Sequence, residues 1–294
     1  MKSSRTLPPM GFILLAAITL FWGINWPIMK TALTEIPPWT FRLYCLVFGG
    51  TGLLLLVKVS GRSLAIPKKE LKPLLLVSFL NITGWHLFSA HGLLYINAGR
   101  ASIIAFTMPV WAAILSSYIL KERMTKARLL GLALGISGLA ILIGPDLKVF
   151  GSAPLGAFFM LTAALSWAAG TVSIKYYHWT MPIALLTAWQ LLLGGIPIVI
   201  GALILEPVTV IFTISWQVAI ALAFVILVAI IFCQWAWFKV VDIFPATLAA
   251  LGTLLIPIVG VFSSALLLGE PIGFQELASL TLIVIALAIV MIKP

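Results

Sequence analysis

Long apolar stretches separated by short polar connections make up almost all of the chain. A helix needs roughly 20 mostly apolar residues to cross a bilayer, and ten stretches approach or exceed that length. They cover residues 10–30, 38–57, 73–95, 101–120, 127–144, 153–174, 182–204, 214–238, 244–268 and 273–292. The pattern predicts an all-α membrane protein with ten transmembrane helices. We expect the first stretch to be a retained span rather than a signal peptide, because it lacks a small-x-small cleavage site.

The composition excludes a water-soluble globular protein. Hydrophobic residues make up 62% of the 294 positions, charged residues only 9%, and the mean hydropathy is +1.19. Soluble domains are about half apolar and about a quarter charged. Cys45 and Cys233 both lie inside apolar stretches, so we expect neither a disulfide framework nor a thiolate metal site, and we expect no cofactor.

The positive charges lie between the apolar stretches and predict the topology. The formal net charge is +10, but the basic residues are not clustered on one soluble face, so nucleic acid is not an expected partner. With a cytoplasmic N-terminus, 14 of the 18 Lys and Arg residues lie inside, and only Lys30, Arg42, Arg100 and Lys148 lie outside. This asymmetry predicts a multi-pass protein of the cell inner (plasma) membrane with both termini in the cytoplasm.

Residues of scarce types recur at a fixed spacing in the two halves of the chain. A shift of 145 residues places the first span on the sixth, and a shift of 148 places the fourth on the ninth. The superposed pairs include Trp22 and Trp167, Lys30 and Lys175, Pro109 and Pro257, and Glu122 and Glu270. The period contains five spans, and because five is odd the second copy must enter the membrane from the opposite side. We therefore predict two inverted five-helix repeats, residues 1–148 and 149–294, as in many secondary transporters.

The same segments resemble the drug/metabolite transporter superfamily, specifically its ten-helix EamA-type members. The similarity rests on LFWGINWPIMK and LSWAAGTVSIK in the first and sixth spans, and on FTMPVWAAILSSYILKERMT and LLIPIVGVFSSALLLGEPI in the fourth and ninth. The resemblance implies an inner-membrane exporter or exchanger of small organic metabolites, with a cavity lined by helices 1, 3, 4, 6, 8 and 9. Two positions depart from the family pattern. Lys121 replaces the usual Gly, and Ala168 follows Trp167 where the family has Trp-Gly.

Polar and aromatic side chains inside the spans are candidates for a substrate site, because a polar group at membrane depth needs a partner or a water-filled space. In the third span, Asn81, Trp85, Phe88 and Tyr95 recur at spacings of 4, 3 and 7 and share one face, with His91 at its flank. The full set of candidates is Trp22, Asn25, Trp26, Asn81, Trp85, His91, Tyr95, Ser166, Trp167, Gln234, Trp237 and Thr253. Together they predict a cavity that is aromatic, hydrogen-bonding and uncharged.

Structural roles are the alternatives for these residues. Asn25, Asn81 and Gln234 are equally suited to bridging helices through side-chain hydrogen bonds. A buried neutral histidine is more often structural than titrating, and proton coupling through His86 or His91 is the less favoured alternative.

Six further residues are candidates for gating or structural roles: Lys30, Pro109, Glu122, Lys175, Pro257 and Glu270. Pro109 and Pro257 are expected inside the fourth and ninth helices, where a proline removes a backbone hydrogen bond and bends the helix. Glu122 and Glu270 end the same helices on opposite sides of the membrane. We expect them to be lock points that pair with Lys or Arg in one state, with simple solvation of the helix ends as the alternative.

The absence of acidic residues from the middle of any span narrows the mechanism, because such a carboxylate usually couples transport to protons or sodium. We predict alternating access driven by the substrate's own gradient or by a weakly bound ion. The expected substrate is a zwitterionic or neutral, amino-acid-like metabolite, moved by export, and the expected partners are this substrate and membrane lipid, with the protein monomeric. An importer, a membrane-embedded enzyme and a pore are the alternatives, although no catalytic constellation and no continuous polar stripe is evident in the sequence.

Overall fold

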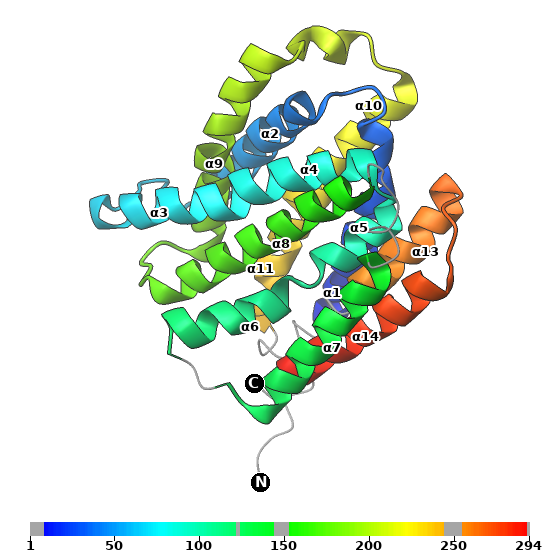
Figure 1. Ribbon diagram of the computed structural model, residues 1–294. Helices are drawn as coiled ribbons and strands as arrows, with labels where there is room; N and C mark the ends of the chain where they lie inside the picture. Colours follow the sequence, from blue (N-terminus) through cyan, green and yellow to red (C-terminus); the bar gives the residue numbers. More distant parts are fainter. Residues whose placement is uncertain (1–8, 122–123, 144–152, 244–254, 293–294) are drawn as a thin grey trace.

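The computed structural model describes residues 9–121, 124–143, 153–243 and 255–292, and all regular structure in these ranges is helical (Figure 1). Seven stretches within them are long and apolar enough to cross a membrane: Pro9–Ala32, Pro38–Val59, Lys68–Tyr95, Ala98–Ile119, Pro154–Tyr176, Ile183–Leu205 and Trp216–Trp237. Three further apolar helices are shorter: Leu129–Leu142, Ile256–Leu268 and Phe274–Ile289. The prediction of an all-α membrane protein is confirmed, whereas the count of ten crossings stays a prediction.

The helices of the first half follow the apolar stretches of the sequence. They are α1 (Pro9–Ala32), α2 (Pro38–Val59), η1 (Lys68–Glu70), α3 (Leu71–Ser78), η2 (Phe79–Gly84), α4 (Trp85–Tyr95), α5 (Ala98–Ala105), α6 (Met108–Ile119) and α7 (Lys126–Ile143). The segments from η1 to α4 form one continuous helical stretch, and η2 within it is a π-helix.

The second half has the same order of long and interrupted helices. Its elements are α8 (Ala153–Tyr176), α9 (Ile183–Leu205), η4 (Val208–Phe212), α10 (Trp216–Phe224), η5 (Val225–Phe232), α11 (Cys233–Ile243), α13 (Ile256–Leu268) and α14 (Phe274–Ile292). The segment η5 is again a π-helix, and it begins 146 residues after η2.

The expected fourth helix is interrupted, which corrects the interpretation of the two prolines. A turn at Phe106 and Thr107 separates α5 from α6, and Pro109 is the second residue of α6. Pro257 is likewise the second residue of α13. Proline suits the first turn of a helix, because the N–H that it lacks has no partner there in any residue. Both prolines therefore start a helix instead of bending the middle of one.

Each π-helical segment gives a backbone carbonyl to a side chain of a neighbouring helix. The Ser166 hydroxyl of α8 donates to the carbonyl of Leu80 in η2 at 2.7 Å. The indole N–H of Trp22 in α1 donates to the carbonyl of Ala229 in η5 at 2.9 Å. Carbonyls that lose helical partners inside a membrane must be satisfied by their neighbours, so these contacts stabilise the two irregular segments.

The helices pack in pairs that join the two halves. α2 lies against α9 at one side of the molecule, and α7 lies against α14 at the other (Figure 1). Between these pairs, α1 contacts α10, η5, α11 and α13, while α8 contacts α3, η2, α4 and α6. α1 and α8 therefore lie in the interior of the bundle, between the two pairs.

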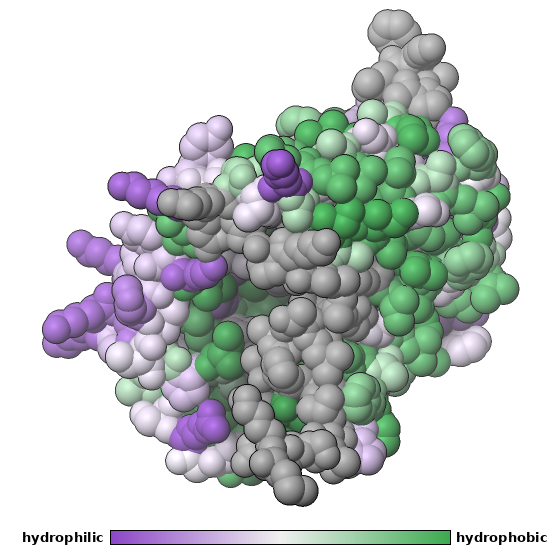
Figure 2. All heavy atoms as spheres, turned by 90° about the horizontal axis from the view of Figure 1, so that it is seen from below, coloured by the Kyte–Doolittle hydropathy of each residue, from purple (hydrophilic) through white to green (hydrophobic). Residues whose placement is uncertain are grey.

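Large apolar side chains cover much of the outer surface. Phe212, Leu266 and Ile204 are among the most exposed, at 86%, 85% and 74%. Seen from below, the hydrophobic residues form one broad continuous area and the hydrophilic residues gather on the opposite side (Figure 2). An apolar exterior of this extent fits a protein whose surroundings are lipid chains rather than water.

Candidate substrate site

Three of the predicted tryptophans meet at the centre of the bundle, although they come from three helices. The ring centroids of Trp26 in α1 and Trp85 in α4 are 6.4 Å apart, and the planes are nearly perpendicular at 82°. Trp85 also lies 5.2 Å from Trp167 of α8. We call Trp26, Trp85 and Trp167 the tryptophan cluster. It joins both halves of the chain and presents indole surfaces of the kind that bind apolar or aromatic groups.

A second aromatic pair lies one turn before Trp26 in α1. The rings of Trp22 and Trp237 are 6.1 Å apart, and Gln234 is half-buried one turn before Trp237 in α11. Because the Trp22 N–H is engaged by the η5 carbonyl, this ring is held in place on the side of the bundle away from α8.

The structure places Asn81 in a contact between helices, one of the two roles considered for it. Its side-chain amide donates to Oε1 of Gln190 in α9 at 3.2 Å. A Cβ added at Gly170 would lie 1.8 Å from Asn81 Oδ1, so α8 approaches η2 closely at a position where only glycine fits. Gln190 was not among the predicted residues, although a glutamine inside the apolar span 182–204 was the available signal.

The remaining residues of the predicted stripe also contact α8, near its N-terminal end. The ring of Tyr95 stacks on Phe159 at 6.1 Å, and Phe88 stacks on the same ring at 6.2 Å. His91 lies 5.7 Å from Phe159, and its Nδ1 is 2.9 Å from the carbonyl of Leu87. The stripe therefore shares one side as predicted, but its residues pack on a helix instead of lining an open cavity in this conformation.

Three buried polar atoms of the elements that carry the tryptophan cluster and the start of the predicted stripe have no hydrogen-bond partner among the described residues. They are Oδ1 of Asn25, which precedes Trp26 in α1, Oδ1 of Asn81 in η2, and Nδ1 of His86, which follows Trp85 in α4. A buried polar atom without a partner costs free energy, and such atoms point to a missing ligand, water or conformational change.

The most important residue that the sequence analysis missed is Arg42, which was counted as a cation outside the membrane. It lies in the second turn of α2 and is 2% exposed. Its Nε donates to the carbonyl of His86 at 2.9 Å, and its Nη2 contacts Oγ of Ser89 at 3.0 Å and Sδ of Met29 at 3.4 Å. Its place inside the apolar stretch 38–57 was the only signal. The expectation that Arg42 lies outside the membrane-buried part of the protein is therefore wrong, whereas the expectation of an uncharged site stays a prediction.

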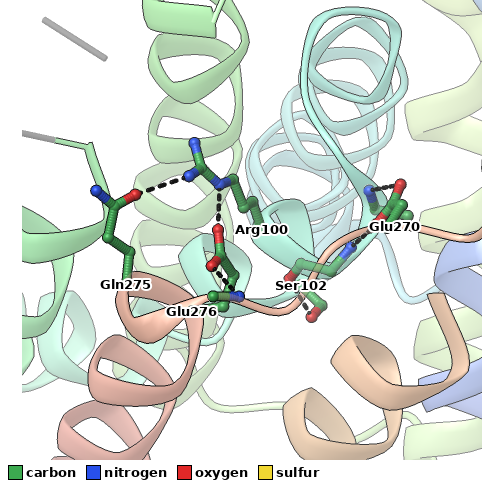
Figure 3. A network of polar contacts seen from close by, with 8 residues as sticks. Arg100, Ser102, Glu270, Gln275 and Glu276 are labelled. Atoms are coloured by element: carbon green, nitrogen blue, oxygen red, sulfur yellow. Dashed lines mark hydrogen bonds and ion pairs between the residues drawn. The ribbon is translucent and has the colours of Figure 1, made fainter. Parts of the chain in front are cut away.

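The predicted gating residue Glu270 does not pair with a Lys or Arg side chain through a hydrogen bond or salt bridge among the described residues. Its carboxylate accepts hydrogen bonds from the backbone N–H groups of Ala98 at 2.7 Å and Gly99 at 2.9 Å (Figure 3). These are the first two residues of α5. A carboxylate at a helix N-terminus satisfies free N–H groups and interacts favourably with the helix dipole. The contact fastens the end of α13 to the start of α5.

An ion pair next to this contact joins α5 to α14. Arg100 Nε lies 2.7 Å from Oε1 of Glu276, and its Nη2 donates to Oε1 of Gln275 at 3.0 Å (Figure 3). Glu276 also accepts from the backbone N–H of Gly273 at 2.8 Å. The distribution of basic residues predicts Arg100 outside the membrane but predicts no partner for it.

Lys30 ties α1 to the end of α4. Its ammonium group donates to the backbone carbonyls of Leu93 and Ile96. Its counterpart Lys175 is exposed in the last turn of α8. Of the other predicted residues, Glu122 and Thr253 lie outside the described residues.

Two further carboxylates connect elements near α9. Glu206, which follows α9, accepts from the backbone N–H groups of Trp39 at 3.3 Å and Thr40 at 2.7 Å in the first turn of α2. Glu70, the last residue of η1 directly ahead of α3, accepts from the N–H of Thr180 ahead of α9 at 2.8 Å. Glu206 therefore fastens the end of α9 to the start of α2, and Glu70 fastens the start of α3 to the segment before α9.

An exposed contact joins the connection between α1 and α2 to the start of α10. Glu35 accepts from the backbone N–H of Ser215 at 2.6 Å. Hydrogen bonds from the side chain and the backbone of Ser215 lower the pKa of the Glu35 carboxyl below its ordinary value.

Two surface grooves differ from this centre in character. One runs between α2 and α9 along Leu46, Leu192 and Ile196, and the other lies between α1 and α13 along Phe12, Leu20 and Val259. Their linings are almost entirely apolar, so they suit lipid chains better than a polar metabolite.

Comparison with known proteins gives one family over the whole length. The sequence model of the EamA-like transporter family matches residues 9–144 and again residues 154–292. The uncharacterized transporter YvbV of Bacillus subtilis is 32% identical over 288 residues, which are 96% of this chain and 91% of that protein. A probable amino-acid metabolite efflux pump of Salmonella typhimurium is 29% identical over 287 residues, 95% of this chain and 93% of that protein.

One solved crystal structure has the same fold. It superposes with a TM-score of 0.67 at 17% sequence identity and covers 97% of this chain and 98% of its own. At this identity the likeness concerns the fold alone.

Proposed function

Because the chain belongs to the EamA-like transporter family, we propose that it is a secondary transporter that moves a small organic metabolite across the inner membrane by alternating access. The metabolite is amino-acid-like and is zwitterionic or neutral overall, and the direction is export. The match of the family model to both halves of the chain carries this proposal. Relatives from Salmonella typhimurium and Escherichia coli that are named probable amino-acid metabolite efflux pumps support the substrate class and the direction.

Correspondences between the halves support the arrangement as two inverted five-helix repeats. The π-helical segments η2 and η5 begin 146 residues apart, and each accepts a hydrogen bond from the long helix beside it. The contacts of α1 with α11 and α13 correspond to the contacts of α8 with α4 and α6. In such a transporter, two similar halves exchange conformations and thereby open the path to alternate sides.

The substrate site that we propose is centred on the tryptophan cluster. Trp26, Trp85 and Trp167 come from helices of both halves, and unpartnered polar atoms of Asn25 and His86 lie next to it in the sequence. An aromatic surface with a few polar groups is the usual composition of a small-molecule site. Indole rings bind the apolar part of an amino acid, and the polar atoms orient its ends.

The gating contacts that we propose lie at one end of the bundle. Lys30 joins the ends of α1 and α4, Glu270 joins α13 to α5, and Arg100 joins α5 to α14. With both termini in the cytoplasm, as the distribution of basic residues predicts, this end faces outward. The structure would then be closed on the outer side, and export requires that these contacts break.

Reconstitution into proteoliposomes tests the proposal. We expect labelled L-amino acids to cross with a rate that saturates with concentration and increases when unlabelled substrate is present on the opposite side. Both features arise from a carrier that must reorient around its substrate. Protein-free liposomes are the control.

The same assay separates the alternatives. A rate that stays proportional to concentration and ignores substrate on the opposite side would indicate a pore. A chemically altered product would indicate an enzyme, a reading that the family and the names of the relatives disfavour. Either result contradicts the proposal that the protein is a secondary transporter.

A further inference from the structure

Arg42 is a buried cation for which the described residues provide no acidic partner. It is 2% exposed, and its three hydrogen-bonding contacts are all neutral: a carbonyl oxygen, a hydroxyl oxygen and a thioether sulfur. The guanidinium carbon also lies 4.9 Å from the centre of the neutral Phe41 ring. Burying a charged side chain without a counter-ion is costly, and in membrane proteins such residues usually mark a substrate or ion path. Glu206, the acid at the first turn of the same helix, is already engaged by the backbone N–H groups of Trp39 and Thr40.

The guanidinium group has donor capacity to spare. Arginine carries five N–H donors in a planar fork, and the contacts of Arg42 use only Nε and Nη2. Nη1 therefore has no hydrogen-bond partner within the ranges that the structure describes. A fork with unused N–H groups matches the two oxygens of a carboxylate, which it binds through two parallel hydrogen bonds.

The position of Arg42 relative to the tryptophan cluster connects this cation to the proposed substrate site. Its contact Met29 lies three residues after Trp26 in α1, and its contact His86 directly follows Trp85 in α4. Since a helical turn contains 3.6 residues, both contacts are within one turn of the cluster. The guanidinium therefore reaches the same region of α1 and α4 that carries the indole rings.

We propose that Arg42 binds the carboxylate of the transported metabolite, while the tryptophan cluster contacts its apolar part. The buried acceptor Oδ1 of Asn25, one turn before Met29, is suited to the ammonium group of a zwitterion. This assignment rests on the proposed transport function and deepens it by naming the group that the substrate must carry. Binding neutralises the buried cation, which stabilises the occupied state relative to the empty one.

A comparison of acids with amides tests the assignment without any substitution. Purified protein in lipid nanodiscs is heated with individual L-amino acids and, separately, with the corresponding L-amino acid amides, in which a neutral carboxamide replaces the carboxylate. We expect the acid that raises the unfolding temperature most to bind at least about tenfold more tightly than its amide, because a hydrogen bond to a charged group is lost. Equal affinities for acid and amide, or no shift with any acid, overturn the assignment.

Variants of Arg42 identify the residue responsible. Arg42→Gln removes the charge, so the affinities for acid and amide should become equal, whereas Arg42→Lys keeps the charge without the fork and should retain part of the preference. Lys58→Gln is the matched control, because Lys58 is an exposed cation in the last turn of the same helix, and it should bind as the wild type does.

A merely structural role for Arg42 gives a different result. If the residue only ties α2 to α4, Arg42→Gln lowers the unfolding temperature of the empty protein but leaves the ratio of acid to amide affinity unchanged, and this outcome overturns the assignment. If Arg42→Gln does not fold, Arg42→Lys and the wild-type ratio decide the question.

The transport assay separates this assignment from the proposed function. If proteoliposomes transport an amino acid amide as fast as the corresponding acid, the proposed transport function stands, but Arg42 is not the group that binds the substrate. Proteoliposomes that transport none of the compounds that shift the unfolding temperature contradict the proposed function itself.

Discussion

Lys121 adopts a backbone conformation that favours glycine. Its φ is 55°, in the left-handed region, and Gly269, which lies 148 residues later, has a φ of 67° and ends α13. Both residues follow a helix that begins with a Met-Pro or Ile-Pro pair. The resemblance to the family could mark Lys121 as unusual, because glycine is usual there, but only the structure gives the conformational reason.

We expect Lys121→Gly to raise the free energy of unfolding by about 1 kcal/mol. A residue with a Cβ pays roughly 1–2 kcal/mol in the left-handed region, and glycine returns part of this through its greater freedom in the unfolded chain. Thermal unfolding of the purified protein measures the change. Lys58→Gly, at a helical position of α2, is the control and should lower stability instead. If Lys121→Gly instead lowers the free energy of unfolding, the left-handed conformation of Lys121 does not strain the backbone.

Single residues of the candidate site were predicted to different extents. Trp26, Trp85 and Trp167 could be selected from the sequence because they lie deeper in their apolar stretches than the tryptophans near span ends, and the structure brings them together. The partner of Asn81 could not be predicted from the sequence. Gln190 comes from a different helix, and only packing decides which helices touch. Arg42 was missed because counting charges at span ends treats a cation near an end as solvated, whereas α4 buries it.

At the scale of elements, helices are fastened to each other by carboxylates at their N-termini. Glu206 holds the start of α2, and Glu270 holds the start of α5. In each case the acid follows one helix and the free N–H groups belong to another, so the same interaction that caps a helix also fixes two helices relative to each other. A lock of this kind makes its hydrogen bonds without a basic partner, and the pairing of Glu270 with a Lys or Arg in another state stays a prediction.

Glu270→Gln is expected to loosen the junction between α13 and α5. The amide keeps one acceptor oxygen but loses the charge that the helix dipole favours, so the free energy of unfolding should fall by about 1 kcal/mol. If this junction closes the outer side, the variant should also exchange substrate faster than the wild type in proteoliposomes. Glu35→Gln is the control, because Glu35 is an exposed acceptor for Ser215 away from α5 and α13, and a smaller effect is expected. If both variants change the free energy of unfolding and the exchange rate equally, Glu270 has no special role in closing the outer side.

The sequence predicts where the helices lie better than it predicts where they are interrupted. The apolar stretches locate the helices because length and hydropathy suffice to identify a span. The π-helical segments η2 and η5 leave no such trace, since one additional residue in a turn does not change the hydropathy. Pro109 was expected to bend a helix, but the turn at Phe106 and Thr107 makes it the start of a new one.

At the scale of the whole molecule, the pairing of helices between the halves is the feature that an inverted repeat explains most simply. α2 packs on α9 and α7 packs on α14, and under an exchange of the halves each of these pairs is converted into itself. The contacts of α1 with α10, η5, α11 and α13 are converted into the contacts of α8 with α3, η2, α4 and α6. A single ancestral packing used twice would give this pattern, and it requires that equivalent residues of the two halves face opposite sides of the membrane.

Labelling of single cysteines tests this requirement. Lys121 and Pro271 are both exposed, and they follow the equivalent helices α6 and α13. The native Cys45 and Cys233 are buried, so the parent protein should react little and is the background control. In intact cells, a membrane-impermeant maleimide should label Pro271→Cys but not Lys121→Cys, and in inverted vesicles the order should reverse. Reaction of both cysteines from the same side would contradict the inverted repeat, and with it the assignment of the Glu270 and Arg100 contacts to an outer gate.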